Sequence, residues 1–220
     1  MERDDADRGA TPVADIVREY GPFAATEKVG GVTYDGKHVW FATGDRMQSF
    51  EPESGQTGRA LHVEADAGST FDGEHFFQLA HGMIQKIDPH TGAVLSTIAS
   101  PAGSNSAGLT WAEGKLWVAD YRGRAILQID PATGSVLSSI ASTRFVTGVT
   151  FVEGELWHGT WENEESELRR VDPKSGEILD AVKMPDGVFV SGLEADGRDL
   201  FYCGSGSTAK VRSVRRPKRR

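Results

Sequence analysis

Short apolar runs alternate with turns rich in glycine and aspartate along the whole chain, and no long segment has helical periodicity. The runs recur in groups of four, and the group that starts at Gly108 continues with runs at 116–119, 126–129 and 136–140. Short apolar runs bounded by turn residues are typical of β-strands. The pattern therefore predicts an all-β fold assembled from four-stranded units.

These four-stranded units form a repeat. The two clearest copies are GLTWAEGKLWVADYRGRAILQIDPATGSVLSSIA from Gly108 and GVTFVEGELWHGTWENEESELRRVDPKSGEILDAV from Gly148, and weaker copies begin at Gly31, Gly68 and Gly192. A repeat of roughly forty residues with four strands per copy suits the blades of a β-propeller. Five copies in 220 residues predict one five-bladed β-propeller.

The turn between the first and second strands has the same signal in every copy, Asp-Gly or Glu-Gly. A type I′ turn needs positive φ at both central positions, and Asp-Gly is among its strongest signals. We therefore expect a two-residue hairpin turn at this place in every blade. The five signals are Asp35-Gly36, Asp72-Gly73, Glu113-Gly114, Glu153-Gly154 and Asp196-Gly197.

The two ends of the chain predict how the ring closes. The last repeat stops near Arg216-Pro217, before its fourth strand, and segment 13–20 precedes the first full repeat like an orphan fourth strand. Pairing of these two segments completes the fifth blade and removes exposed sheet edges. We expect one propeller domain at 11–213, a disordered N-terminus at 1–10 and a basic C-terminal tail at 214–220. The repeat glycines should open the inner strands, where small residues suit crowding about the axis.

The antiparallel strands of a blade assign each loop to one of two faces. The turns between strands one and two, and between strands three and four, lie on one face, called the turn face, and their sequences are uniform. The approach to strand one and the end of strand two lie on the other, called the mouth face, and differ between blades. Because loops on a rigid scaffold commonly carry sites, we expect the site on the mouth face. The approaches bring Lys28, Asp66, Asn105, Arg144 and Phe189 to it.

The junction of blades three and four carries the strongest candidate site. Asp120 and His158 are candidate acid/base groups, with Glu162 as a further catalytic carboxylate. Tyr121 and Trp161 are candidate walls that stack on a ligand. Each has a structural alternative: a strand-end aspartate, a buried histidine bonded to backbone, or aromatic packing between blades. The remaining candidate substrate-binding residues are His81, Asn105, Arg144 and Glu194.

Composition narrows the choice of partners and cofactors. The formal net charge is −8, although the last eleven residues carry seven basic and no acidic side chains. An acidic body disfavours nucleic acid as the main partner, and no stretch approaches the ~20 apolar residues of a membrane helix. Cys203 is the only cysteine, which excludes an intrachain disulfide. The six histidines lack the spacings HxH and HExxH, so we expect no metal and no cofactor.

The N-terminal sequence MERDDADRGATP is polar and has no apolar run of signal-peptide length. The simplest interpretation is a cytoplasmic protein. We further expect a monomer that binds a small-molecule or peptide substrate.

The repeat in the fourth blade resembles the glutaminyl cyclases of plants and bacteria. The stretch LWHGTW…LRRVDPKSGEIL, within 155–179, is similar to that family's W-A-N-V-W…R-I-D-P-x-T-G, and the repeat pattern extends the resemblance over nearly the whole chain. The resemblance implies a five-bladed propeller that cyclises N-terminal glutamine. The strand pattern is also similar to that of the streptogramin lyases, whose seven blades need a longer chain.

Two positions depart from the pattern of the glutaminyl cyclases. The family's catalytic glutamate lies in a first-blade stretch like L-Y-E-S-T-G, and Phe41 stands at the matching position here. The asparagine of W-A-N-V-W falls on Gly159, whereas Trp157 and Trp161 match.

Cyclisation needs a carboxylate that carries a proton from the amine to the leaving ammonia. In the absence of the family glutamate, Asp120, Glu162 or Glu194 would have to supply it. The sequence therefore predicts a small-molecule-binding propeller, either a glutamine cyclotransferase-like or lyase-like enzyme acting on an amine or amide, or a non-catalytic scaffold that binds a ligand or protein. Cyclisation of glutamine itself is not expected.

Overall fold

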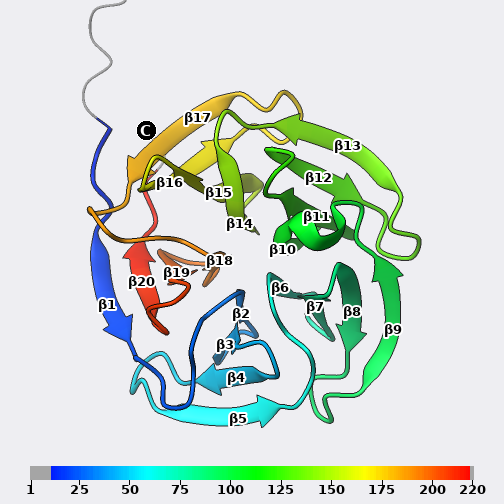
Figure 1. The fold of residues 1–220 in the computed structure, drawn as a ribbon. Helices are drawn as coiled ribbons and strands as arrows, with labels where there is room; N and C mark the ends of the chain where they lie inside the picture. The colour runs from blue at the N-terminus through cyan, green and yellow to red at the C-terminus, as the bar shows by residue number, and fades with distance from the viewer. Residues whose placement is uncertain (1–10, 219–220) are drawn as a thin grey trace, which may run out of the picture.

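The computed structural model describes residues 11–218. It contains five four-stranded antiparallel sheets that stand around a central axis (Figure 1). Each sheet is one blade, with an inner strand beside the axis and an outer strand at the rim. The five-bladed β-propeller expected from the repeat is confirmed.

In every blade the strand order runs outward from the axis. Blade one holds β2 (Val32–Tyr34), β3 (Val39–Ala42), β4 (Met47–Phe50) and β5 (Thr57–Leu61). Blade two holds β6 (Ser69–Phe71), β7 (Phe76–Ala80), β8 (Met83–Ile87) and β9 (Val94–Ala99). Blade three holds β10 (Ser106–Ala112), β11 (Lys115–Asp120), β12 (Ala125–Ile129) and β13 (Val136–Ala141), preceded by the short 3₁₀ helix η1 (Gly103–Asn105). Blade four holds β14 (Phe145–Val152), β15 (Glu155–Glu162), β16 (Glu165–Val171) and β17 (Ile178–Lys183). Blade five holds β18 (Gly192–Ala195), β19 (Leu200–Gly204), β20 (Val211–Arg215) and β1 (Ile16–Tyr20).

Blade five combines the two ends of the chain, as Figure 1 shows for the blue and red strands. Its outer strand β1 pairs antiparallel with β20, and the register places Ile16 opposite Val214. An ion pair between Arg212 and Glu19, with 2.5 Å between the closest atoms, supports the same pairing. The predicted closure of the ring by the N-terminal strand is confirmed.

The segment before β1 also contacts blade four. The N–H group of Ala14 donates to the carbonyl of Lys183, and the N–H group of Lys183 donates to the carbonyl of Pro12, both at 2.8 Å. The N-terminal segment therefore links the outer strands of two adjacent blades.

The C-terminal strand extends beyond the expected domain boundary. β20 ends at Arg215, and the side chain of Val214 is fully buried in the core. A tail that begins at 214 is therefore too long, because these two residues complete the strand that pairs with β1. Residues 1–10, for which we expect disorder, and 219–220 lie outside the described residues.

The five repeat glycines form a ring around the axis. A Cβ atom added at any of them would lie less than 3.0 Å from backbone atoms of the next blade. Real Cβ atoms do not approach backbone so closely, so only glycine allows the five inner strands to come this near to one another. The ring consists of Gly31, Gly68, Gly108, Gly148 and Gly192.

The turns between first and second strands differ from expectation in three blades. Glu113-Gly114 and Glu153-Gly154 have positive φ at both positions, as a type I′ turn requires. In the Asp-Gly turns only the glycine has positive φ. Asp35, for example, accepts the N–H groups of Lys37 and His38 on its Oδ1 atom at 2.8 and 2.6 Å. This Asx geometry lengthens the turn, so the expectation of a two-residue turn is wrong at the Asp-Gly signals.

The hydrophobic core is divided into clusters that each lie between two adjacent blades. Phe41 belongs to the cluster between blades five and one, where it is fully buried and stacks on Phe23 with 4.3 Å between ring centroids. The position that matches the family's catalytic glutamate is therefore filled by core packing. No helix in the described part of the chain is long and apolar enough to cross a membrane.

Candidate functional site

Two connected hollows open on the mouth face. The larger, about 870 Å³, is lined by the approaches to the inner strands of blades one, two, three and five and by the turn that follows β11. The smaller, about 280 Å³, lies over blades four and five. Tyr121 and Ser191 line both hollows, so the two form one continuous mouth.

The larger hollow is polar and carries charges of both signs. Lys28, Arg122 and Asp66 line it, together with Asn105 and the serines on either side of it. Within residues 11–218, neither Lys28 nor Arg122 makes an ion pair. Two cations without a protein partner beside a carboxylate suit a ligand that has both acceptor and donor groups.

Asp66 is the one carboxylate that lines the mouth among the described residues. Its Oδ2 atom lies 3.4 Å from Nδ1 of His81 and accepts the backbone N–H of His81 at 3.0 Å. The other ring nitrogen of His81 lies 3.4 Å from Glu64. A carboxylate that faces a hollow and is paired with a histidine is an arrangement that can accept and pass on a proton. His81, which we expected to bind substrate, instead stands behind Asp66 at the rim.

The smaller hollow is aromatic. Trp161 and Phe189 meet edge to face with 4.5 Å between ring centroids, and Tyr121 also lines the hollow. Thr147 also lines it, and the buried hydroxyl of Thr147 has no hydrogen-bond partner in the part of the chain that the structure describes. A buried hydroxyl without a partner is destabilising unless something else satisfies it, so a polar ligand group in this hollow is favoured.

Gly159 makes room for this hollow. A Cβ atom at this position would lie 2.6 Å from Oγ1 of Thr147 and 2.9 Å from a methyl group of Val190. The asparagine of the glutaminyl cyclase pattern therefore cannot occupy this position unless the side chains of Thr147 and Val190 shift.

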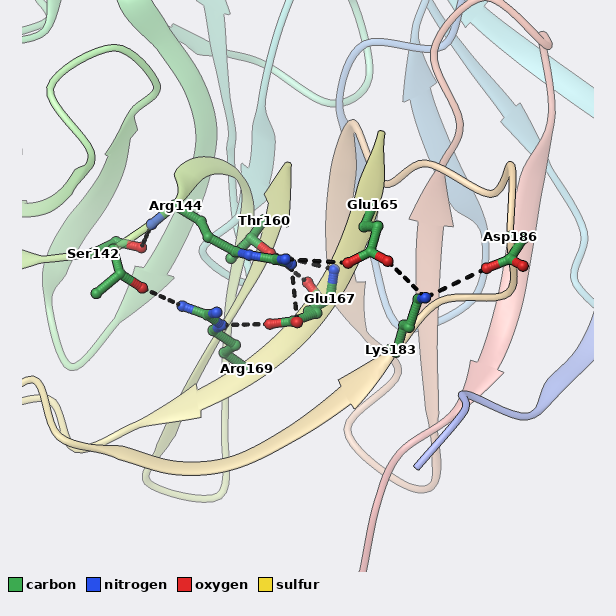
Figure 2. A network of polar contacts seen from close by, with 9 residues as sticks. Ser142, Arg144, Thr160, Glu165, Glu167, Arg169, Lys183 and Asp186 are labelled. Carbon is green, nitrogen blue, oxygen red and sulfur yellow. Dashed lines mark hydrogen bonds and ion pairs between the residues drawn. The ribbon is translucent and has the colours of Figure 1, made fainter. Parts of the chain in front are cut away.

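A polar network braces the rim of blade four (Figure 2). Arg144 pairs with Glu165 at 3.3 Å and with Glu167 at 2.9 Å, and Lys183 pairs with Glu165 at 2.8 Å. Hydrogen bonds from Lys183 and Arg144 lower the pKa of Glu165. Arg144, which we expected to bind substrate, does not line either hollow but holds the β15–β16 hairpin that carries Trp161.

Asp120 and Glu162, two of the candidate catalytic residues, make local contacts at the mouth rim. Oδ1 of Asp120 accepts the N–H of Gly123 at 2.9 Å and so caps the turn after β11. Glu162 pairs with Arg124 of blade three at 3.0 Å. Neither carboxylate lines a hollow, so the structure does not bring them together with Asp66.

His158 is buried inside blade four. It is only 2% exposed, and its Nδ1 atom lies 3.3 Å from the carbonyl of Gly159. Burial lowers the pKa of His158 to about 4, so the imidazole is neutral at neutral pH. These contacts match the structural alternative, a buried histidine bonded to backbone.

Glu194 lies at the other end of the axis. It follows Gly192 by two residues in β18, and the hollow that it lines also contains Asp196 and Gly197 of the turn face. Its expected place at the mouth is wrong, because those two residues carry the inner strand away from the mouth. Burial raises the pKa of Glu194 to about 7.

Several residues of the mouth escaped the candidate set. Lys28 and Asp66 lie on the approaches to inner strands, where their position in the repeat placed them on the mouth face. Thr147 and Ser191 each stand directly before a repeat glycine. Their position on the approach to an inner strand could therefore have identified them as mouth residues. Among the described residues, no group of three histidine, cysteine or acidic side chains could hold a metal ion.

Comparison with known proteins supports the same architecture. Residues 141–204 match the family model described as glutamine cyclotransferase. Over 92% of this chain and 96% of the other, the fold matches the crystal structure of Myxococcus xanthus glutaminyl cyclase with a TM-score of 0.75 and 18% sequence identity. The chain has the fold of a glutaminyl cyclase.

The family match covers blade four and the two inner strands of blade five, and does not reach Phe41 in blade one. No curated protein sequence matches the chain. In all, 1173 chains of solved structures match it. A shared fold does not determine function, which depends on the residues of the mouth.

Proposed function

We propose that the mouth binds a small molecule, or the end of a peptide, that carries an amine or amide group. The observation that carries this proposal is the junction of a polar hollow, lined by Asp66, Lys28 and Arg122, with an aromatic hollow that contains the unpartnered hydroxyl of Thr147. In this proposal Asp66 receives the amine, the serines and Asn105 bond the amide, and Trp161 covers the apolar part of the ligand.

We further propose that the site is enzymatic, with acid/base chemistry at Asp66. The carboxylate accepts a proton from the substrate amine, and His81 behind it exchanges that proton with solvent. This chemistry is glutamine cyclotransferase-like or lyase-like in class. Cyclisation of glutamine itself is not proposed, because Phe41 is buried where the family's glutamate would act.

The test is a screen of amino acids, amino-acid amides and short peptides by thermal shift, followed by mass spectrometry of the compounds that raise the melting temperature. We expect a bound compound to bear an amine or amide. Asp66→Asn and Trp161→Ala should each abolish the shift without lowering the melting temperature of the free protein by more than a few degrees. Asp45→Asn is the matched control, because Asp45 is an exposed carboxylate paired with Arg46 outside both hollows.

A non-catalytic binding propeller is the second candidate function. The observation that favours it is that Asp120, Glu162 and His158 are all engaged in local contacts. The same screen separates the two candidates. An enzyme converts the bound compound, and Asp66→Asn lowers its turnover by about 10²–10⁴-fold, whereas a scaffold returns the compound unchanged. If no compound bearing an amine or amide binds, the proposed mouth ligand is wrong.

A further inference from the structure

A third hollow lies at the turn-face end of the propeller axis. It has a volume of about 430 Å³ and is lined by residues from all five blades. Because the ring of repeat glycines separates it from the mouth along each inner strand, it is a distinct hollow with its own chemistry.

A ring of four threonines and one glutamate surrounds the axis here, and Thr70, Thr110 and Glu194 of this ring line the hollow. The second residue after the repeat glycine is threonine in four blades and Glu194 in the fifth. The hydroxyls of Thr33 and Thr150 donate to the two carboxylate oxygens of Glu194 at 3.1 and 2.7 Å. The carboxylate is thus held across blades one, four and five at the axis.

The wall of this hollow is aromatic. The third residue after the repeat glycine is Tyr34, Phe71, Trp111 or Phe151 in four blades, and Ala195 in the fifth. All four aromatic side chains line the hollow and are half-buried. Neighbouring rings hold them in place, as where Trp111 stacks on Phe77 with 5.4 Å between centroids.

Thr110 adds a polar group without a protein partner. Thr110 is a buried residue that lines the hollow, and its hydroxyl makes no hydrogen bond within residues 11–218. A ligand in the hollow can therefore accept a hydrogen bond from this hydroxyl or donate one to it.

We propose that this hollow binds a substituted ammonium ion, with Glu194 as counter-ion and the aromatic rings as its wall. Aromatic faces attract organic cations, and rings of aromatic side chains are a common way to recognise alkylated ammonium groups. The charge of the lining agrees with this assignment. Within the described part of the chain no lysine, arginine or histidine lines the hollow, and the other ionisable lining residues are Tyr34, Asp35, Asp72 and Asp196.

The test compares choline with dimethylbutanol, its uncharged carbon isostere, by calorimetric titration of the full chain above pH 8, where Glu194 is ionised although burial raises its pKa to about 7. We expect choline to bind at least about tenfold more tightly than the alcohol. Glu194→Gln keeps the size of the side chain and its acceptor oxygen but removes the charge, and should weaken choline binding about tenfold. Phe151→Leu should weaken it as well, and circular dichroism would verify that both variants are folded.

Trp161→Ala locates the bound choline, because it alters the mouth and leaves the turn face intact. Choline affinity should be unchanged in this variant. The proposal is overturned if choline does not bind, if the alcohol binds as tightly, or if Trp161→Ala removes binding while Glu194→Gln does not. Because Asp66→Asn tests the mouth and Glu194→Gln tests this hollow, either proposal can fail without the other.

Discussion

The two ends of the propeller axis are built by opposite means. At the mouth, each blade contributes a different loop, and the hollows arise where those loops fail to repeat. At the turn face, four blades contribute the same residue types, and the chemistry arises from one exception, Glu194 in a ring of threonines. The difference teaches that uniform turns at the rim do not exclude a site at the centre of the same face.

The largest expected effect concerns the scaffold that both ends share. Deletion of residues 1–20 removes β1 and should lower the free energy of unfolding by several kcal/mol or abolish folding, because β20 loses its partner. Deletion of residues 1–10 is the control and should be nearly silent. Urea denaturation followed by tryptophan fluorescence measures both. An unchanged midpoint for the longer deletion would rule out closure by β1.

The next effect tests whether the mouth can be given the family's glutamate. Phe41→Glu places a carboxyl in an aromatic cluster and should destabilise the protein by about 4 kcal/mol without producing pyroglutamate. Phe41→Leu is the control and should lower stability less, because it keeps the site apolar. We predict that the chain, although it has the fold of a glutaminyl cyclase, does not cyclise glutamine. Robust cyclisation of N-terminal glutamine by the wild type, or by a folded Phe41→Glu variant, would contradict this prediction.

A third prediction compares the two buried titratable residues through pH. The pKa of Glu194 is raised from 4.5 to about 7, so its contribution to stability is full below pH 4.5 and lost as pH rises to about 7. The pKa of His158 is lowered from 6.5 to about 4, so its contribution is full above pH 6.5 and lost as pH falls to about 4. Each amounts to about 3 kcal/mol, and between pH 4.5 and 6.5 the two slopes oppose each other.

Removing either titratable group should therefore reveal the pH dependence of the free energy of unfolding that the other group causes. In Glu194→Gln the free energy of unfolding should rise as pH increases from about 4 to 6.5, and in His158→Gln it should fall from pH 4.5 to about 7. Urea denaturation across this range, with the wild type as reference, measures both. Parallel profiles in all three proteins would mean that neither group titrates in the folded state as its burial implies.

The smallest effect compares aspartates that cap turns on the two faces. Asp120→Ala at the mouth and Asp35→Ala at the turn face should each lower the free energy of unfolding by about 1 kcal/mol, because each carboxylate accepts backbone N–H groups. Asp120→Asn should be nearly neutral, since an amide oxygen can still accept. If Asp120→Asn weakens the mouth ligand more than tenfold, Asp120 belongs to the site after all.

Much of the fold could be predicted because the same pattern of strands and turns occurs in all five copies of the repeat. The apolar runs and the repeat glycines located the blades, and the orphan segment before Gly31 located the closing strand. The geometry of the turns was harder to predict. The residue types of Asp-Gly favour a type I′ turn, but the carboxylate of Asp35 can also accept backbone N–H groups of the residues that follow it. The sequence does not show which of the two turn geometries forms.

The candidate site was less predictable, because it depends on where side chains point. The position of Asp120 on the mouth face follows from the strand order, but its contact with Gly123 does not. Successive side chains along β15 point to opposite faces of the blade. Only the structure shows that the face on which His158 lies is buried. Glu194 was expected on the wrong face because two residues of an inner strand already carry the chain from the mouth toward the turns. The repeat itself, aligned blade by blade, carries that information.

The closing strand has a mechanical consequence. Because Ile16 lies opposite Val214, the chain enters β1 and leaves β20 at the same end of the pair. Force applied to both termini would therefore peel the two strands apart one hydrogen bond at a time, instead of shearing all of them together. A propeller held by both ends should first lose the hydrogen bonds of Pro12 and Ala14 to Lys183 of blade four and then open at this seam, at low force, before the strands of blades one to three carry load.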